Sequence, residues 1–178
     1  MTSNQGAKIN MASFPTKALS IRQPWAWAII YAGKDIENRT WQAVRHGLED
    51  AGGRFAVHAS KGMTQDEYDS TASFMASIGV KCPAAKDLQR GGIIGTVELV
   101  ECVKHHDSPW FFGPRGLVLR NPEPCEFIPC TGALGFFKHQ RDDSVTAPLA
   151  RWMDPENYQG RVRLETPDRQ LALLGERQ

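Results

Sequence analysis

Short segments of the chain alternate between apolar and polar residues, and glycine, proline or polar residues bound each of them. Alternation with a period of two predicts strands. The most regular segment is the β-branched run at 91–103, in which Gly95 predicts a bend of the kind that small barrels need. The proline-rich run after residue 121 is expected to stop the strand before it. The predicted strands are residues 17–21, 36–41, 54–60, 91–103, 115–121 and 133–139.

Other segments carry the signals that begin and end helices. A proline suits the first turn of a helix over residues 25–32, and Gly33 suits the left-handed position that ends it. A second helix begins at the capping box formed by Thr64 and Glu67, and a glycine ends it. A third helical candidate lies near residues 147–153.

Short strands, few helices and many turns together predict a mostly β fold with flanking helices, of the α+β class. We expect a small antiparallel β-barrel of about six strands with two or three helices packed on it. Residues 17–140 hold most of these signals and form the predicted domain. A flexible polar leader at 1–16 precedes this domain, and a C-terminal extension at 141–178 follows it.

The composition is that of a globular protein. The chain has 178 residues, 41% hydrophobic and 23% charged, which is enough for one domain with a proper core. No apolar run reaches membrane-spanning length and the N-terminus lacks a secretory signal, so we expect a cytoplasmic protein with no membrane partner. The four cysteines are even in number, but a chain of this length does not need disulfides, so we expect reduced thiols. Paired Cys-x-x-Cys spacing is missing, which argues against a metal site, and we expect no cofactor.

The distribution of charge is more informative than the formal net charge of +1. Residues 1–46 carry a net charge of +4, whereas residues 47–140 carry −2 and residues 141–178 carry −1. Positive charge therefore gathers around the first predicted helix, although a leader that happens to be basic explains it equally. A nearly neutral protein is expected to recognise nucleic acid through a compact site rather than along an extended track.

Charged and amide side chains are crowded into residues 20–41, SIRQPWAWAIIYAGKDIENRTW. Lys34 follows the glycine that ends the helix, so its ammonium can bind a phosphate or a base carbonyl or, if desolvated, act as a base. Glu37 and Arg39 share one face of the next strand, where Glu37 can accept from a base amino group and Arg39 can fork onto a phosphate. The alternative is a same-face ion pair worth about 0–1 kcal/mol if it is exposed.

The start of the first helix is a candidate phosphate-binding corner. Ser20, Arg22 and Gln23 lie beside its free N–H groups, which favour anions. Alternatively, Gln23 caps the helix and Arg22 is solvated. Trp25 and Trp41 offer aromatic faces on which an unpaired base can stack, although tryptophans of small barrels also fill the core.

His58 lies near the end of a predicted strand, with a serine and a lysine close behind it. A histidine in that position can be a general base or can contact a base edge. The alternative is a histidine that is hydrogen-bonded as part of the structure. The order of serine, histidine and aspartate along the chain predicts no classical triad.

These residues together resemble the ASCH domain, a family named for its homology to an activating-signal cointegrator. The family hallmark is Gly-x-Lys-x-x-Glu-x-Arg after a Ser-x-x-Gln-Pro helix start. Here Gly33 directly precedes Lys34, and the match holds from Lys34 through Glu37 to Arg39. The resemblance covers about residues 18–138, and the combined motif is more specific than its Lys-x-x-Glu-x-Arg part. The later runs that resemble bacterial and phage members are GRFAVHAS, GGIIGTVELVECV, SPWFFGPRGLVL and PCTGALGFF.

The resemblance implies a barrel similar to PUA domains, which bind RNA, with a cleft for RNA or nucleotide-like ligands between the barrel and the first helix. It also implies two enzymatic alternatives, a ribonuclease and an amidohydrolase of acetylated cytidine. The amidohydrolase uses a lysine, a threonine three residues later and a distant glutamate. Lys34 matches the lysine, whereas Glu37 stands in the place of the threonine, and Glu98 or Glu101 would supply the distant glutamate.

We therefore interpret the chain as an RNA- or nucleotide-binding module with a basic cleft beside the barrel. The first alternative is a hydrolase acting on RNA or on an acylated or modified nucleoside, with Lys34 and Glu37 as its catalytic residues. The second is a protein-interaction module, which the cointegrator relationship keeps open; the sequence does not disclose the oligomeric state. The predicted ligand contacts are Ser20, Arg22, Gln23, Trp25, Lys34, Glu37, Arg39 and His58.

Overall fold

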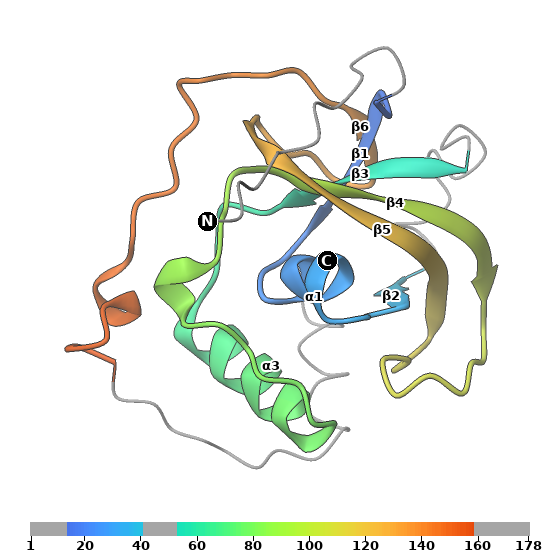
Figure 1. The fold of residues 1–178 in the computed structure, drawn as a ribbon, viewed down its shortest axis with the longest axis horizontal. Coiled ribbons are helices and arrows are strands. Elements are labelled where there is room, and N and C mark those ends of the chain that lie inside the picture. The colour runs from blue at the N-terminus through green and yellow to red at the C-terminus, as the bar shows by residue number, and fades with distance from the viewer. Residues whose placement is uncertain (1–13, 41–52, 159–178) are drawn as a thin grey trace, which may run out of the picture.

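The computed structural model describes residues 14–40 and 53–158. The six strands in this part of the chain form one curled mixed sheet, a half-barrel, in the order β2-β5-β4-β3-β1-β6 (Figure 1). The predicted fold class, mostly β with flanking helices, is thereby confirmed. The strands are β1 (Lys17–Ile21), β2 (Ile36–Arg39), β3 (Arg54–Ala59), β4 (Gly92–Val103), β5 (Arg115–Pro129) and β6 (Phe136–Lys138). The helices are α1 (Trp25–Tyr31) and α3 (Gln65–Ser77), with short 3-10 turns η2 (Ala85–Asp87) and η3 (Arg151–Met153).

The sheet is antiparallel except between β1 and β3, which run parallel with Ser20 opposite His58. Parallel neighbours need a long crossover connection, and α1 and β2 lie between these two strands in the chain. Side chains at the same level of two neighbouring strands point to the same face of the sheet. This pairing therefore brings Ser20 and His58 together, each next to last in its strand.

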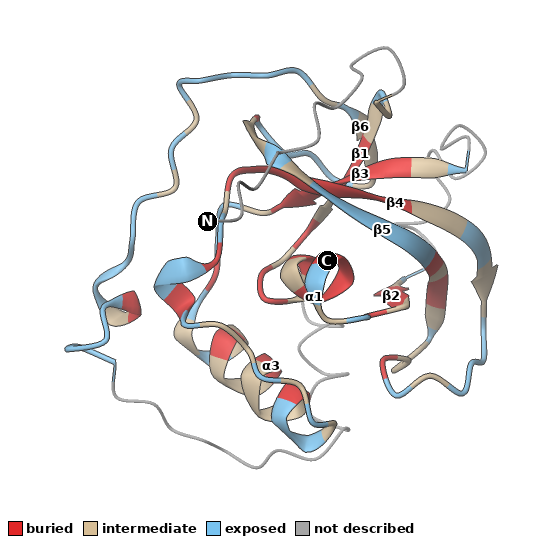
Figure 2. Ribbon diagram, viewed as in Figure 1, coloured by how far each residue is buried: buried red, intermediate tan, exposed pale blue. Residues whose placement is uncertain are grey.

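Helix α1 lies in the hollow of the curled sheet (Figure 1), and its apolar side chains form part of the main core. Ile29 and Ile30 are buried there, and the buried residues of the sheet gather around the helix (Figure 2). Gly95 of β4 permits this close contact, because a Cβ atom on it would lie 2.7 Å from Cδ1 of Ile30 and 2.6 Å from the backbone oxygen of Glu123. The pairing register with both neighbouring strands shifts beside Gly95, so the predicted bend is confirmed.

Strand β5 is longer than predicted, because the proline-rich run does not stop it. Pro122 and Pro124 lie within the strand and are exposed. Strand β2 pairs with β5 only from Arg115 to Val118, so the later residues of β5 pair with β4 alone. A proline has no N–H to donate, and it is tolerated where one side of a strand has no partner.

Helix α3 begins and ends at the residues that the sequence indicated. The N–H of Glu67 donates to Oγ1 of Thr64 at 3.2 Å, and the N–H of Thr64 donates to Oε2 of Glu67 at 2.9 Å, which confirms the capping box. Gly79, just beyond the helix, has a φ of 78°. The aromatic cluster between α3, α1 and the segment before β5 consists of Trp25, Phe74, Trp110 and Phe112.

The segment after β6 runs along the outside of the molecule and returns to the region of α3 (Figure 1). The helix predicted near 147–153 is wrong, because only Arg151–Met153 form a single 3-10 turn. Pro148 and Pro155 disfavour a helical conformation of the residue before each of them, which limits the turn. Met153 is nevertheless buried in a small apolar cluster with residues at the start of α3.

Parts of the predicted organisation lie outside the described residues. These are most of the leader at 1–16 and residues 159–178 of the C-terminal extension. Within 14–40 and 53–158, no helix combines the length and the apolar character needed to cross a bilayer.

Candidate functional site

Three charged side chains at the end of α1 and along β2 form an ion-pair network. Nζ of Lys34 donates to Oε2 of Glu37 at 3.0 Å and also to the backbone carbonyl of Ile36. Nη2 of Arg39 lies 3.1 Å from Oε1 of Glu37. One carboxylate therefore bridges two cations, which agrees with the predicted shared face of Glu37 and Arg39.

This network is far less exposed than a surface ion pair. The side chains of Lys34, Glu37 and Arg39 are 1%, 9% and 19% exposed. The ring centroid of Trp25 lies 5.7 Å from Nζ of Lys34, within the range of a cation–π contact. Burial lowers the pKa of the Lys34 ammonium below its usual value, while the charge and the hydrogen bond of Glu37 oppose that shift. Each charge in the network thus depends on its partner.

Arg39 connects the network to strand β1. Its Nη2 also donates to the backbone carbonyl of Ser20 at 2.6 Å. Three strands separate β2 from β1 in the order of the sheet, so it is the curl of the sheet that brings these two residues within contact. The guanidinium thereby fixes the backbone of Ser20 to the Lys34–Glu37 pair.

The side chain of Ser20 is hydrogen-bonded to His58. Oγ of Ser20 lies 3.1 Å from Nδ1 of His58, and Nε2 of the same ring lies 3.1 Å from the backbone carbonyl of Cys130. A carbonyl oxygen only accepts, so Nε2 carries the proton and Nδ1 accepts from the Ser20 hydroxyl. His58 is 2% exposed, and burial lowers its pKa below the ordinary value, against the opposing effect of the Cys130 carbonyl. The ring is therefore neutral at pH 7, with one fixed tautomer.

A cavity of about 650 Å³ opens beside Ser20 and His58. Its lining comes from the ends of β1 and β3, from the turn after β3, from the segment after β5 and from the segment after β6. This volume lies within the range of about 300–1,000 Å³ that is typical of small-molecule sites. The polar residues of the lining include Ser20, His58, Lys61, Thr131, Asp142 and Ser144.

Opposite charges cancel in the lining of this pocket, and two arginines hold the turn beside it. The charged lining residues are Lys61 and Asp142. Nη1 of Arg22 and Nη1 of Arg90 donate to the backbone carbonyls of residues 62 and 61, at 3.1 Å and 2.8 Å. Two guanidinium groups therefore hold the turn that carries Lys61.

Arg22 and Gln23 have partners within the protein. Nη2 of Arg22 lies 3.1 Å from Oε1 of Glu67, so its guanidinium is shared between the turn and α3. Gln23 is 1% exposed; its amide donates to the carbonyl of Gln89 at 2.7 Å and accepts from the N–H of Trp27 at 3.0 Å. The amide of Gln23 thus holds the first turn of α1, where an N–H group otherwise lacks an intrahelical acceptor.

Trp25 is packed among other aromatic rings. Its centroid lies 5.7 Å from that of Phe74, 6.4 Å from that of Trp110 and 5.8 Å from that of Phe112. The tilted and edge-on orientations of these rings are those that stabilise an aromatic core. Trp41, the other predicted stacking residue, lies outside the described residues.

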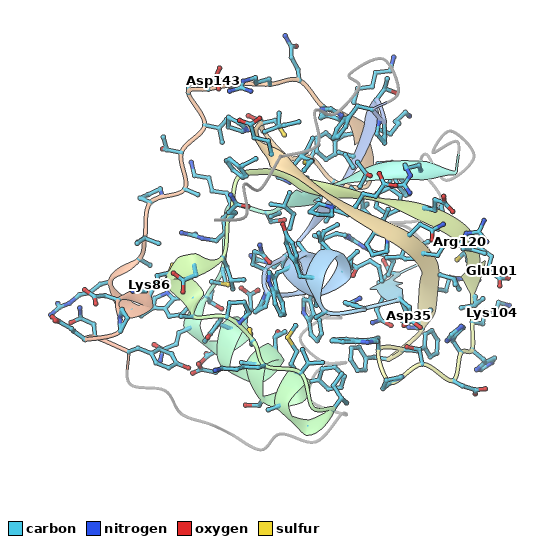
Figure 3. All side chains as sticks on the ribbon, in the orientation of Figure 1. Asp35, Lys86, Glu101, Lys104, Arg120 and Asp143 are labelled. Atoms are coloured by element: carbon cyan, nitrogen blue, oxygen red, sulfur yellow. The ribbon has the colours of Figure 1, made fainter. Side chains whose placement is uncertain are left out.

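The glutamates considered for an amidohydrolase are not among the hydrogen-bond or ion-pair partners of Lys34, which are Ile36 and Glu37. Oε2 of Glu98 lies 2.7 Å from Nε of Arg120, and Oε1 lies 3.5 Å from Nη2 of Arg54. Figure 3 shows Glu101 at the periphery of the molecule, and it is exposed. Within the described ranges, no group of three His, Cys, Asp or Glu residues is placed to hold a metal ion.

The sequence did not reveal that Ser20 and His58 form a pair. Each is next to last in a strand, but the pattern of a strand does not show which other strand it joins. The wall of the pocket was also missed: Lys61, Thr131 and Asp142 come from turns and from the predicted extension, where no periodic pattern exists. The sequence feature that could have indicated the pocket was the cluster of serine, lysine and histidine at the end of β3.

Comparison with known proteins identifies one part of the chain. The family model described as ASCH domain matches residues 19–124. This range begins within β1 and ends within β5, so it contains α1, the ion-pair network and the Ser20–His58 pair. The wall of the pocket after β5 lies beyond it. No curated protein matches the chain.

Proposed function

The chain belongs to the ASCH domain family, and we propose that it binds RNA or a nucleotide-like ligand in the pocket beside Ser20 and His58. One observation carries this proposal: a continuous polar path leads from Lys34 through Glu37 and Arg39 to Ser20 and ends at the lining of a cavity. The hydrogen bonds and ion pairs of Lys34, Glu37 and Arg39 fix the geometry of this path.

The residues that line the pocket are suited to recognise a base and a sugar. Hydroxyls of Ser20, Thr131 and Ser144 can donate or accept, and Asp142 can accept from an exocyclic amino group or a sugar hydroxyl. Because Lys61 and Asp142 nearly cancel in charge, selectivity for a ligand rests on hydrogen bonds. A single nucleotide or a short single-stranded segment fits this arrangement better than a long duplex.

The turn after β3, which carries Lys61, is suited to recognise a phosphate. Arg22, Lys61 and Arg90 lie around one turn, and their side chains or the backbone they hold border the cavity. Basic side chains at a rim attract and position phosphates, and their contribution falls as the salt concentration rises. We therefore expect the phosphate of the ligand at the turn after β3.

The proposal gives the predicted residues two kinds of role. Ser20 and His58 line the pocket and meet the ligand, and Arg22 holds the turn that carries Lys61. Lys34, Glu37 and Arg39 hold Ser20 in place. Gln23 and Trp25 hold α1, through the first-turn hydrogen bond and the aromatic cluster. The roles of the family motif are thus those of positioning residues.

Fluorescence anisotropy with a labelled single-stranded RNA of mixed sequence tests this proposal. The wild-type chain should bind saturably, and Lys61→Ala should weaken binding by about tenfold, which corresponds to about 1.4 kcal/mol. Lys104→Ala is the matched control, because Lys104 is an exposed lysine that does not line the pocket. Figure 3 shows Lys104 at the opposite side of the molecule from Asp143, which lies in the segment that contributes to the pocket wall.

The two lysine variants separate a site from general charge. Equal weakening by Lys61→Ala and Lys104→Ala would mean that the RNA senses only the net charge. Absence of saturable binding by the wild-type chain, to the RNA and to each nucleoside monophosphate, would contradict the proposal altogether.

A further inference from the structure

The Ser20–His58 pair supports an inference that goes beyond ligand binding. We propose that Ser20 is a nucleophile with His58 as its general base, and that this pocket hydrolyses small carboxylic esters. The proposal concerns the reactive pair and the cavity, and it does not depend on whether the pocket also takes RNA.

The geometry is that of an activated serine. The 3.1 Å distance between Oγ of Ser20 and Nδ1 of His58 is within the reach of a nucleophile and its base. The carbonyl of Cys130 accepts from Nε2, which leaves Nδ1 free to take the proton. In a Ser-His-Asp site a carboxylate orients the imidazole. Here the backbone carbonyl of Cys130 orients the imidazole through Nε2, and Nδ1 is the nitrogen that faces the serine.

The nucleophile must be accessible to the substrate, whereas the base can be buried, and the two side chains differ in this way. Ser20 is partly exposed and lines the cavity, whereas His58 is 2% exposed. A substrate carbonyl can therefore reach the hydroxyl while most of the imidazole stays shielded from bulk water. The neutral state of the buried ring keeps Nδ1 able to accept a proton at pH 7.

The segment at residues 131–134 lines the cavity beside the reactive pair. Gly132 lies against both groups, since a Cβ atom on it would be 2.7 Å from Oγ of Ser20 and 2.5 Å from Cε1 of His58. The backbone N–H groups of residues 131–134 donate to no acceptor in the described parts of the chain. The proposal assigns the oxyanion to the backbone N–H groups of this exposed segment, because amides beside a nucleophile can stabilise a tetrahedral oxyanion in acyl transfer.

The proposed ester hydrolysis needs Ser20, His58 and water, and no other reactant. Oγ of Ser20 attacks the ester carbonyl carbon and its proton passes to Nδ1 of His58. The C–O bond of the ester then breaks, and the leaving alkoxide takes the proton from His58. A water molecule then gives a proton to Nδ1 of His58 and attacks the carbonyl carbon of the acyl-serine. The bond between that carbon and Oγ of Ser20 breaks, Oγ takes the proton back from His58, and the carboxylic acid is released.

Acylation of the full-length chain by p-nitrophenyl acetate tests the proposal, in buffer that contains no nucleic acid. Intact-mass spectrometry should detect one acetyl group per chain, and peptide mapping should place it on Ser20. A fluorophosphonate probe should label the same residue. Ser20→Ala should abolish labelling and lower the hydrolysis rate by at least about 100-fold.

Two further variants make the result decisive. His58→Gln keeps an amide that can donate to Cys130 and retains Ser20, so it should lower acylation to a similar extent. Ser77→Ala is the control serine, because Ser77 is exposed on α3 and does not line the pocket. If His58→Gln does not fold, the Ser20→Ala result decides. Unchanged hydrolysis in Ser20→Ala, or an acyl group on another residue, overturns the proposal.

The ester and RNA assays fail independently. A chain that binds RNA saturably but is not acylated loses only the nucleophile assignment. A chain that is acylated at Ser20 but binds neither RNA nor nucleotides keeps the reactive pair and loses the proposed function.

Discussion

At the scale of single residues, Glu37 is the side chain on which the site depends most. Its two carboxylate oxygens each hold a different cation, Lys34 at 3.0 Å and Arg39 at 3.1 Å. Arg39 in turn holds the backbone of Ser20. Losing the anion therefore leaves two poorly exposed cations side by side and releases the strand that carries the proposed nucleophile.

Glu37→Gln should lower the free energy of unfolding by about 3 kcal/mol, because removing one partner of a buried pair leaves an uncompensated charge. Lys34→Met should cost less, since Glu37 keeps Arg39 as its partner and no buried cation is left over. Urea unfolding of the two variants measures which of them loses more unfolding free energy.

Glu101→Gln is the control for these variants, because Glu101 is exposed. Its unfolding free energy should match that of the wild-type chain to within about 0.5 kcal/mol. A Glu37→Gln variant as stable as the Glu101→Gln variant would show that the network contributes nothing to the fold.

His58 makes the stability of the chain depend on pH. Its folded pKa lies below the ordinary value of 6.5, so at a pH just under 6.5 the unfolded chain binds a proton that the folded chain does not. The free energy of unfolding should therefore fall as the pH drops from about 6.5 to about 5.5, by at most about 1.4 kcal/mol per pH unit. Urea titrations at the two pH values measure this slope.

The matching variant is His58→Gln, in which this slope should disappear. His139, whose charge contributes to the shift at His58, remains in the variant. A slope that persists unchanged in His58→Gln would assign it to another group.

At the scale of secondary-structure elements, the position of α1 in the hollow of the sheet depends on Gly95. The glycine lets β4 approach both Ile30 of the helix and the backbone of β5. The end of α1 in turn places Gly33, with a φ of 69°, and the turn that carries Lys34. A change at Gly95 should therefore reach the ion-pair network through the helix.

Gly95→Ala should destabilise the fold by about 1–3 kcal/mol, because its Cβ would lie 2.6 Å from a backbone oxygen that cannot simply rotate away. Gly62→Ala is the matched control, since its Cβ would meet only the flexible end of Arg22, at 3.1 Å. Thermal melts of the two variants decide the point. A melting temperature of Gly95→Ala equal to that of Gly62→Ala would mean that β4 and β5 yield without cost.

At the scale of the whole molecule, local patterns predicted the elements but not how they meet. The capping box at Thr64 and the glycine stop at Gly33 are local features, and the structure confirms both. The parallel pairing that joins Ser20 to His58 depends on contacts between distant segments, which no period-two pattern encodes. The continuation of β5 through Pro124 likewise depends on whether a neighbouring strand is present.

The candidate site divides in the same way. The shared face of Glu37 and Arg39 follows from strand periodicity, so their ion pair was predictable, whereas the pairing of Lys34 with Glu37 was not. The burial of the network was not predictable either, because the aromatic ring beside Lys34 and the strand beside Arg39 come from other parts of the chain. The pocket wall at residues 131–134 follows the longest strand. Residues 133 and 134 were predicted to begin the last strand, but β6 begins only at Phe136.

The segment after β6 contributes to the stability of the whole molecule. Met153 is 3% exposed in a cluster with Met63 and Tyr68. Met153→Ala should therefore lower the free energy of unfolding by about 2–5 kcal/mol, as for other buried large-to-small changes. Leu149→Ala is the control, because Leu149 is 60% exposed. Urea unfolding that gives the same midpoint for both variants would mean that this segment does not hold α3.

The central claim is that the polar path from Lys34 ends at a ligand pocket beside Ser20 and His58. Titration of the ¹⁵N-labelled chain with nucleoside monophosphates, followed by amide chemical shifts, tests it most directly. We predict that the largest shifts fall on Ser20, His58, Lys61 and residues 131–134, and that they saturate together. Shifts confined to the far side around Lys104, or no saturable shift at all, would contradict the claim.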